Sequence, residues 1–392
     1  MPRPTLLTLV VLVAALALAA CGRDDRPSAP QRPALATSGD EPRAATDLGF
    51  PSFATKNTTR IGGSDATAIA AAVARAVYPD PSRRPDAVAL VDRNDWRSAL
   101  AASALMARPI GAPILFTDGA KLPGASRAAL GALNPTGSDA AGDAKVIRVG
   151  AVARPKGRKS TDLTGINPFA RARAIAAMLT GAQRRPPNRV LIVSADDPSF
   201  AAPAAGYAAK TGDPVLFVTK NRLPDETRAA LAALQQPKIY VIGPKRIVSD
   251  RVTRRLGRLG RVRRTGGRDP IRNAIAFARF RDEDFGWGIT DPGHGLVFAR
   301  SGHPLDAAAA APLSGTGTFG PLLLLGVADK LPLKLQQYLL DIQPGFQEDP
   351  VRGVYNHGWI IGDASTISTG VQGSIDALLE IVSVRSPDAP TP

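Results

Sequence analysis

Residues 112–117 read Ala-Pro-Ile-Leu-Phe-Thr, and close counterparts recur twice further along the chain. The second copy is Asp-Pro-Val-Leu-Phe-Val-Thr at residues 213–219, and the third is Gly-Pro-Leu-Leu-Leu-Leu at residues 320–325. Near-continuous apolar runs of this length are typical of strands that are covered on both faces in a parallel sheet. A Leu-Pro pair follows each run, at residues 122, 223 and 331, so the copies are offset by 101 and 108 residues. This recurrence predicts three copies of one α/β unit.

Other features recur in the same order within each copy. An apolar run that predicts an earlier strand lies at residues 87–91, 189–193 and 295–299. An alanine-rich segment that predicts a helix follows it at residues 98–107, 200–209 and 305–313. A later strand is expected to end in an apolar residue and glycine, at Val149-Gly150, Ile242-Gly243 and Ile361-Gly362. Right-handed crossovers between parallel strands are the default for such units.

Each copy opens with a basic or polar residue and glycine, and a helix is expected next. The three openings are Arg-Ile-Gly-Gly at residues 60–63, Leu-Thr-Gly at residues 163–165 and Arg-Thr-Gly-Gly at residues 264–267. In the first copy either Ser64 or Asp65 can cap the helix, because both side chains accept hydrogen bonds from backbone N–H groups. Apolar residues then follow at helical spacing.

This ordered set of features resembles the bacterial cell wall binding repeat 2 family. The resemblance covers about residues 58–382 and is strongest in the first copy, through residues 60–68 and 96–100. The third copy matches least well, because its aspartate stands at Asp306 and residues 283–294 look like an insertion. The resemblance implies an α/β fold of three tandem pseudo-symmetric modules with mainly parallel sheets, packed in a pseudo-threefold arrangement. It also implies non-covalent attachment to anionic wall polymers.

The N-terminal segment predicts export and lipidation. Arg3 and the apolar run at residues 6–20 form a signal peptide, which is too short to span a hydrocarbon layer of about 30 Å. Leu-Ala-Ala-Cys at residues 18–21 contains the only cysteine of the chain and resembles the lipobox of bacterial lipoproteins. In that family the cysteine is acylated and becomes the mature N-terminus. The alternative is an ordinary secretory signal with an unrelated cysteine at position 21.

A polar segment rich in proline, serine and arginine follows Cys21. It cannot bury enough apolar surface to offset the entropy of ordering, so we expect a disordered tether with a reach of roughly 30 to 36 Å. The predicted organisation therefore starts with a signal peptide at residues 1–20 and a tether at residues 21–57. Three repeats follow at residues 58–156, 157–260 and 261–384, and a disordered tail ends the chain at residues 385–392.

The formal net charge of +15 favours anionic partners. A general enrichment in arginine, alanine, glycine and proline is the alternative explanation of the charge. Basic residues gather at the two junctions between repeats, and these are the predicted polymer-binding residues. They are Arg154, Lys156, Arg158 and Lys159 at the first junction and Arg251, Arg254, Arg255 and Arg258 at the second. At the second junction they are expected to cover one face of a helix whose other face carries Val252, Leu256 and Leu259. Guanidinium groups bind phosphate or carboxylate oxygens in pairs, but a solvated helix face has the same pattern.

The sequence offers no convincing catalytic or metal-binding pattern. The histidines, His294, His303 and His357, all lie in the third repeat, and their spacing matches no common metal motif. A single cysteine allows neither an intrachain disulfide nor a cysteine-based metal site. We therefore expect a protein without catalytic residues, metal or cofactor.

Two functions remain consistent with the sequence. The first is a cell-wall-binding lipoprotein, lipid-anchored at Cys21 on the outer face of the cell membrane, whose repeats hold an anionic envelope polymer. The second is a solute-binding lipoprotein with a small ligand between two α/β lobes, which the threefold repeat disfavours. Neither nucleic acid nor an obligate protein partner is expected.

Overall fold

The computed structural model describes residues 52–384 apart from residues 64 and 318, and these residues all fall within one unit of the chain. The predicted signal peptide, Cys21, most of the predicted tether and the tail at 385–392 lie outside the described residues. Residues Ser52–Ala54, at the end of the predicted tether, form strand β1. None of the helices in the described part is long and apolar enough to cross a bilayer.

The fold is mixed α/β with parallel sheets, as the sequence predicts. The first sheet contains β3 (Val88–Asp92), β4 (Ile114–Thr117), β5 (Val146–Val149) and β6 (Ser160–Leu163) in the order β4-β3-β5-β6, and every pair is parallel. Residues 88–91 of β3 have no exposed surface. Complete burial explains why this strand reads as a continuous apolar run.

The other two large sheets repeat this strand order. The second contains β7 (Arg189–Ser194), β8 (Val215–Val218), β9 (Lys238–Ile242) and β10 (Arg261–Thr265) in the order β10-β9-β7-β8. The third contains β11 (Gly295–Arg300), β12 (Leu322–Leu325), β14 (His357–Ile361) and β2 (Thr58–Ile61), with β1 antiparallel to β2 at its edge. A small additional sheet joins β13 (Gly345–Phe346) to β15 (Val382–Ser383).

The sheets are offset from the sequence repeats by one strand. Strand β6 begins the second repeat but pairs with β5 of the first, and β10 begins the third repeat but pairs with β9 of the second. Strand β2 begins the first repeat and pairs in parallel with β14 of the third, where Thr59 lies opposite Trp359. Each sheet therefore receives its edge from the next repeat in order, and β2 closes the series. A pseudo-threefold relation between the modules stays a prediction.

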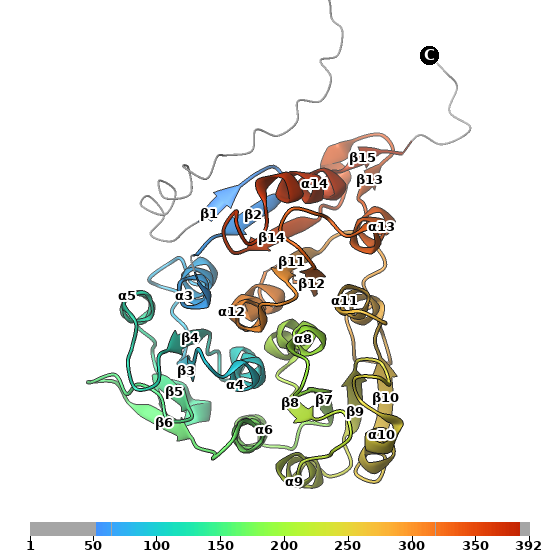
Figure 1. The fold of residues 1–392 in the computed structure, drawn as a ribbon. Coiled ribbons are helices and arrows are strands. Elements are labelled where there is room, and N and C mark those ends of the chain that lie inside the picture. Colours follow the sequence, from blue (N-terminus) through green and yellow to red (C-terminus); the bar gives the residue numbers. More distant parts are fainter. Residues whose placement is uncertain (1–51, 64, 318, 385–392) are drawn as a thin grey trace, which may run out of the picture. The chain divides into compact units, whose positions relative to one another are not determined.

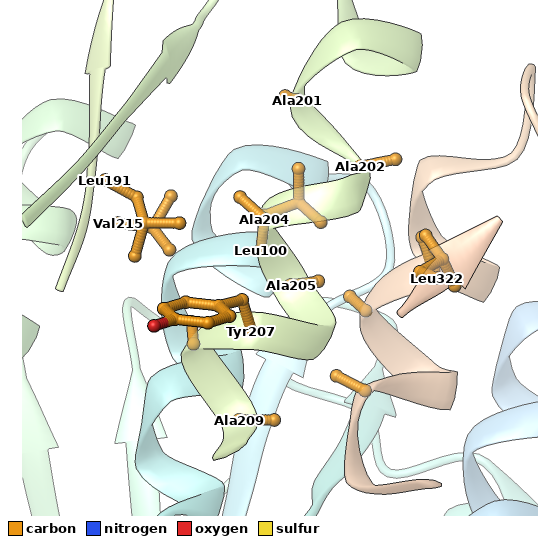
Figure 2. Packing of buried hydrophobic residues seen from close by; sticks show 14 of the residues in the cluster. Leu100, Leu191, Ala201, Ala202, Ala204, Ala205, Tyr207, Ala209, Val215 and Leu322 are labelled. Atoms are coloured by element: carbon orange, nitrogen blue, oxygen red, sulfur yellow. The ribbon is translucent and has the colours of Figure 1, made fainter. Parts of the chain in front are cut away.

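Alanine-rich helices pack together between the sheets (Figure 1). They are α4 (Trp96–Ala102), which continues into a 3₁₀ turn at Ser103–Met106, α8 (Pro203–Thr211), which follows the short α7 (Pro198–Ala201), and α12 (Pro304–Gly315). Helix α12 contacts both α4 and α8. In Figure 2, Ala202, which precedes α8, and Ala205 of α8 point towards Leu322 of β12, whereas Tyr207 points towards Leu191 and Val215.

Small side chains are required where α8 meets α12. A Cβ atom on Gly206 would lie 2.5 Å from Oγ and 2.8 Å from Cβ of Ser314. These distances are shorter than any normal contact, so a larger residue at position 206 would push the helices apart. The abundance of alanine in the sequence therefore reflects close packing between these helices.

The remaining helices pack on the sheets and, in part, on the alanine-rich helices. They are α3 (Ala66–Val77) and α5 (Gly124–Leu133), α6 (Pro168–Gln183) and α9 (Asp225–Ala233), α10 (Asp250–Leu256), α11 (Pro270–Arg279) and α13 (Leu333–Asp341), and α14 (Thr369–Leu379). Short 3₁₀ turns occur at Asp139–Ala141 and Pro350–Arg352.

The helix that follows each glycine opening is capped in the same way. The carboxylate of Asp65 accepts hydrogen bonds from the backbone N–H groups of Thr67 and Ala68, so Asp65 is a cap of α3. Asn167 and Asp269 cap α6 and α11 by accepting from the residue three positions later. A Cβ atom on Gly165 would lie 2.7 Å from the backbone nitrogen of Arg171, which explains why glycine precedes the cap.

A buried arginine fixes the strand that closes the series. Arg60 on β2 has no exposed surface, and its guanidinium donates to the carbonyl oxygens of Gly362, Asp363 and Ile367 at 2.7–2.9 Å. Its Nε also donates to Oε1 of Gln372 on α14 at 2.9 Å. The hydrogen bonds satisfy a charge that would otherwise be costly to bury.

The second junction repeats this arrangement and the first one modifies it. Arg264 on β10 donates to the carbonyl oxygens of Gly243 and Val248 at 2.7 and 2.9 Å. At the first junction the corresponding residue of β6 is Asp162, and the arginine is Arg148, which lies directly opposite on β5. Arg148 donates to Asp162 at 2.7 Å and to the carbonyl oxygen of Ala153 at 3.0 Å.

Replacing Arg60 with Met should destabilise the protein by about 3 to 5 kcal/mol, because several buried acceptors then lose their donor. The measurement is chemical denaturation of the purified protein, with limited proteolysis near residue 60 as a second readout. Arg84→Met, at an exposed position, is the control and should change stability by less than about 0.5 kcal/mol. Equal stability of the two variants would contradict the role assigned to Arg60.

Candidate functional site

The predicted basic cluster at the first junction lies in the loop between β5 and β6. Arg154, Lys156 and Lys159 are exposed and Arg158 is half-buried. Arg154 pairs with Asp162, and Lys159 pairs with Asp143 at 3.3 Å. Two of the four predicted cations therefore form ion pairs within the chain, which reduces the local positive potential, although Asp162 is shared with Arg148.

The predicted cluster at the second junction lies on and just after α10. Val252 and Leu256 are buried, whereas Arg251, Arg254 and Arg255 are exposed. Arg258 is exposed as well but follows the end of the helix. No ion pair to these four arginines is found within the described residues. The prediction of an arginine-covered helix face is confirmed for Arg251, Arg254 and Arg255 and is wrong for Arg258 and Leu259, which follow the end of the helix at Leu256. The binding role of these arginines stays a prediction.

The structure leaves the two predicted clusters on different sheets. The first lies beside β6, the edge strand of the first sheet, and the second lies beside β10, the edge strand of the second sheet. Neither cluster lines the larger cavities found in the structure. The sequence therefore located two charged surfaces but did not locate the hollow part of the molecule.

Three adjoining cavities form a basic groove, which we define by the residues that line them. Their volumes are about 620, 510 and 440 Å³. Val77 and Thr316 line both the first and the third cavity, and Arg108 lines both the second and the third. The shared residues make the cavities neighbours. Their charged lining consists of Arg83, Arg84, Arg108, Arg185, Arg189 and Lys210 with Asp80, Asp86 and Asp213.

The groove lies where helices end and parallel strands begin. Val77 is the last residue of α3, Lys210 lies in the last turn of α8, and Arg108 follows the 3₁₀ turn after α4. Arg189 is the first residue of β7. Helix C-termini carry a partial negative charge, which favours cations at these positions. The topology thus collects arginines from different repeats at one edge of the sheets.

Most of the cations in the groove have no carboxylate partner. Arg83, Arg84, Arg108 and Arg185 are exposed and form no ion pair with any described residue. In the third cavity, burial and the carboxylate of Asp86 raise the pKa of Tyr78 to about 12, so its hydroxyl stays neutral and can donate a hydrogen bond. Free guanidinium groups and a neutral hydroxyl together suit an anionic ligand.

Arg189 and Lys210 have structural partners. Arg189 pairs with the buried Asp213 at 3.1 Å and also with Asp284. Burial raises the pKa of Asp213, although the Arg189 guanidinium opposes this. The Lys210 ammonium lies 3.5 Å from the ring centre of Phe319 and 5.1 Å from that of Trp287, and burial lowers its pKa. The exposed arginines are therefore the cations most available to a ligand.

The groove residues had a sequence signal that the repeat pattern could have revealed. Arg-Arg-Pro occurs at residues 83–85 and again at residues 184–186, with the same offset of 101 residues as the Leu-Pro pairs. Each occurrence directly precedes the first buried strand of its repeat. The third repeat has Asp-Pro-Gly-His at residues 291–294 instead. Only the structure shows that Arg83, Arg84 and Arg185 of these segments line adjoining cavities.

The segment that looked like an insertion packs against the second sheet. Phe285 has no exposed surface and stacks on Tyr240 with ring centres 3.5 Å apart. Trp287 meets Tyr207 edge-on at 5.4 Å. The segment therefore contributes an aromatic cluster to the core beside the groove.

Two of the three histidines are backbone neighbours, because the N–H of His357 donates to the carbonyl oxygen of His294 at 2.9 Å. His303 pairs through Nδ1 with Oδ2 of Asp306 at 3.0 Å, and His294 lies 3.8 Å from Asp291. The ring of His357 meets that of Trp359 edge-on at 4.8 Å. In the part of the chain that the structure describes, no group of three or more His, Cys, Asp or Glu side chains is arranged to hold a metal ion.

The hydrogen bond to Asp306 raises the pKa of His303 above its ordinary value. The contribution of this pair to stability is therefore complete below the unfolded pKa of about 6.5 and is lost as the pH rises through the folded value. NMR titration of the His303 ring should show this raised midpoint, and Asp306→Asn should lower it. A midpoint that does not respond to Asp306→Asn would contradict the assignment.

Comparisons with known proteins now identify one segment and the fold. Residues 163–253 match the family model of cell wall binding domain 2, CWB2. Among solved structures, the chain is similar to Cwp8 from Clostridium difficile, with a TM-score of 0.63, 17% identity, and coverage of 82% of this chain and 52% of that one. For Cwp6 from Clostridium difficile the TM-score is 0.64 and the identity 16%, with coverage of 82% and 49%. The chain thus spans about half the length of these proteins. A comparison with curated proteins gives no match.

Proposed function

We propose that this chain, which contains a cell wall binding domain 2 at residues 163–253, is a lipid-anchored protein that holds an anionic cell-envelope polymer in its basic groove. The family match supports cell wall binding and a place outside the cytoplasm. The lipid anchor and the choice of an anionic polymer are our proposals. We further propose that binding is the activity of the folded part and that it has no catalytic role.

The observation that carries this proposal is the row of unpaired arginines in adjoining cavities. Arg83, Arg84, Arg108 and Arg185 come from two repeats and from separate loops, yet they line one groove. A planar guanidinium can bind two oxygens of a phosphate or carboxylate group at once. A polymer with repeated anionic groups would engage several arginines together, and the combined contacts would slow its release.

The α10 arginines supply a second positive surface, but a convex one. Arg251, Arg254 and Arg255 project from an exposed helix face and line none of the three cavities of the groove. Exposed charges in water contribute little to binding individually because solvent and salt screen them. We therefore place the main contact in the groove and regard the α10 surface as a source of long-range attraction.

A comparison of two variants with equal loss of charge tests the groove. R84Q/R108Q/R185Q should reduce retention on purified cell walls by at least about tenfold, because hydrogen bonds to charged groups contribute about 1.5 to 3 kcal/mol each. R251Q/R254Q/R255Q removes the same charge from α10 and should reduce retention much less. Retention should also fall at high salt and after the anionic polymers are stripped.

The opposite ranking of the two variants would move the binding surface to α10. Wild-type retention by both variants, or retention that ignores polymer stripping, would refute the proposal of an anionic ligand.

Lipid anchoring at Cys21 rests on the sequence of the signal segment. More than one acyl chain makes membrane attachment durable, since each buried CH₂ group contributes about 0.8 kcal/mol. With the tether that follows, the groove would work at roughly 30 to 36 Å from the membrane surface. The protein would thus connect the membrane to an envelope polymer.

Cys21→Ser should abolish incorporation of labelled palmitate and shift the protein from the membrane fraction to the soluble fraction or the medium. The control is Gly22→Ala, which changes the neighbouring residue, leaves the thiol of Cys21 in place and should keep both the label and the membrane association. Continued membrane association of Cys21→Ser with unchanged labelling would contradict lipidation at this residue.

A further inference from the structure

The largest of the three cavities differs in chemistry from the other two. It lies between the ends of α3 and α12 and strands β2 and β14, at the place where β2 closes the series of sheets. Its volume of about 620 Å³ is within the range of small-ligand sites. It holds a single arginine, Arg83, whereas the other two cavities hold Arg84, Arg108, Arg185, Arg189 and Lys210.

An aromatic ring forms part of the wall of this cavity. On β14, Trp359 and His357 are half-buried and line the cavity, whereas Gly358 and Ile360 are buried on the opposite face of the strand. The imidazole ring of His357 contacts the indole ring of Trp359 edge-on, with an angle of 72° between the ring planes, and this contact helps to orient the indole. Thr59 of β2 lies opposite Trp359 in the sheet and lines the same cavity.

Two polar side chains, those of Thr316 and Asp80, line the same cavity as the indole. The hydroxyl of Thr316 donates to the carbonyl oxygen of Pro312 at 2.8 Å and keeps its acceptor positions. The carboxylate of Asp80 accepts hydrogen bonds from Oγ and from the backbone N–H of Ser82, and both lower its pKa, so it is an ionised acceptor. The lining also includes the apolar side chains of Ala76, Val77 and Leu313.

This combination suits a sugar ring better than an isolated anion. A pyranose has an apolar C–H face, which can pack on an indole, and a rim of hydroxyl groups that donate and accept hydrogen bonds. Asp80 would repel a phosphate or carboxylate group but can accept hydrogen bonds from hydroxyls. The Arg83 guanidinium can donate to ring or hydroxyl oxygens.

The position of the cavity links it to the arginine-rich part of the groove. Val77 and Thr316 line this cavity and also the neighbouring one, which contains Arg84, Arg108 and Lys210. A chain that crosses the groove therefore passes from a region of free cations to the indole of Trp359.

We propose that this cavity is a subsite for an uncharged pyranose ring, stacked on Trp359, of the same polymer whose anionic groups lie against Arg84 and Arg108. The inference rests on the proposed function, because that polymer supplies the ring. It adds that the ligand is a glycan with uncharged sugar units and that the protein distinguishes it from a simple polyanion.

The test compares two probes, purified cell walls and inorganic polyphosphate, on the full-length protein in detergent. Trp359→Ala removes the stacking surface, and Ala76→Phe fills the cavity while Trp359 remains. Both should reduce wall retention by about tenfold, which corresponds to about 1.4 kcal/mol, and should leave polyphosphate binding within about twofold of the wild type. Trp359→Phe should retain most wall binding, because it keeps an aromatic face.

Full wall retention by both Trp359→Ala and Ala76→Phe would overturn the subsite. An equal loss of wall and polyphosphate binding by these variants, with unchanged melting temperature, would overturn its selectivity for sugar. A different result would refute the proposed function itself: wild-type binding of R84Q/R108Q/R185Q to both cell walls and polyphosphate.

Discussion

The parallel pairing of β2 with β14, held by the buried guanidinium of Arg60, is the constraint on which the described structure depends. Every large sheet includes a strand from the next repeat, and the series is completed because β2 of the first repeat pairs with β14 in the last sheet. Arg60 reaches four acceptors that lie more than 300 residues away in the sequence. The cavity that Thr59 and Trp359 line therefore forms only when β2 pairs with β14.

The same closure organises the groove. Parallel strands that run in one direction bring helix C-termini together at one edge, and the arginines placed there benefit from the helix dipoles. The repeats have diverged at this edge. The first and second repeats contribute Arg-Arg-Pro segments, whereas the third contributes His357 and Trp359. One repeated scaffold thus offers cations in one part of the groove and an aromatic wall in another.

The buried strands were predictable and the junction strands were not. Strands such as β3 and β8 are covered on both faces, so their burial is visible as an uninterrupted apolar run. Strands β2, β6 and β10 read Thr-Thr-Arg-Ile, Ser-Thr-Asp-Leu and Arg-Val-Arg-Arg-Thr, which lack such a run. They are held by parallel pairing with a strand of another repeat and by the hydrogen bonds of an arginine, which is Arg60 for β2, Arg264 for β10 and, for β6, Arg148 of the neighbouring β5. Neither interaction leaves a local pattern.

The sequence by itself determined the repeat, the α/β class, the close packing of alanine-rich helices and the arginine-covered face of α10, because these depend on local periodicity and side-chain size. It also carried the pattern at Cys21 that predicts an anchor. Only the tertiary structure decided which charges are free. Arg154 and Lys159 form ion pairs with Asp162 and Asp143, whereas Arg84 and Arg108 form none with the described residues and line a cavity. The physical reason is that an electrostatic site depends on distances between residues that are far apart in the chain, and the folded backbone sets those distances.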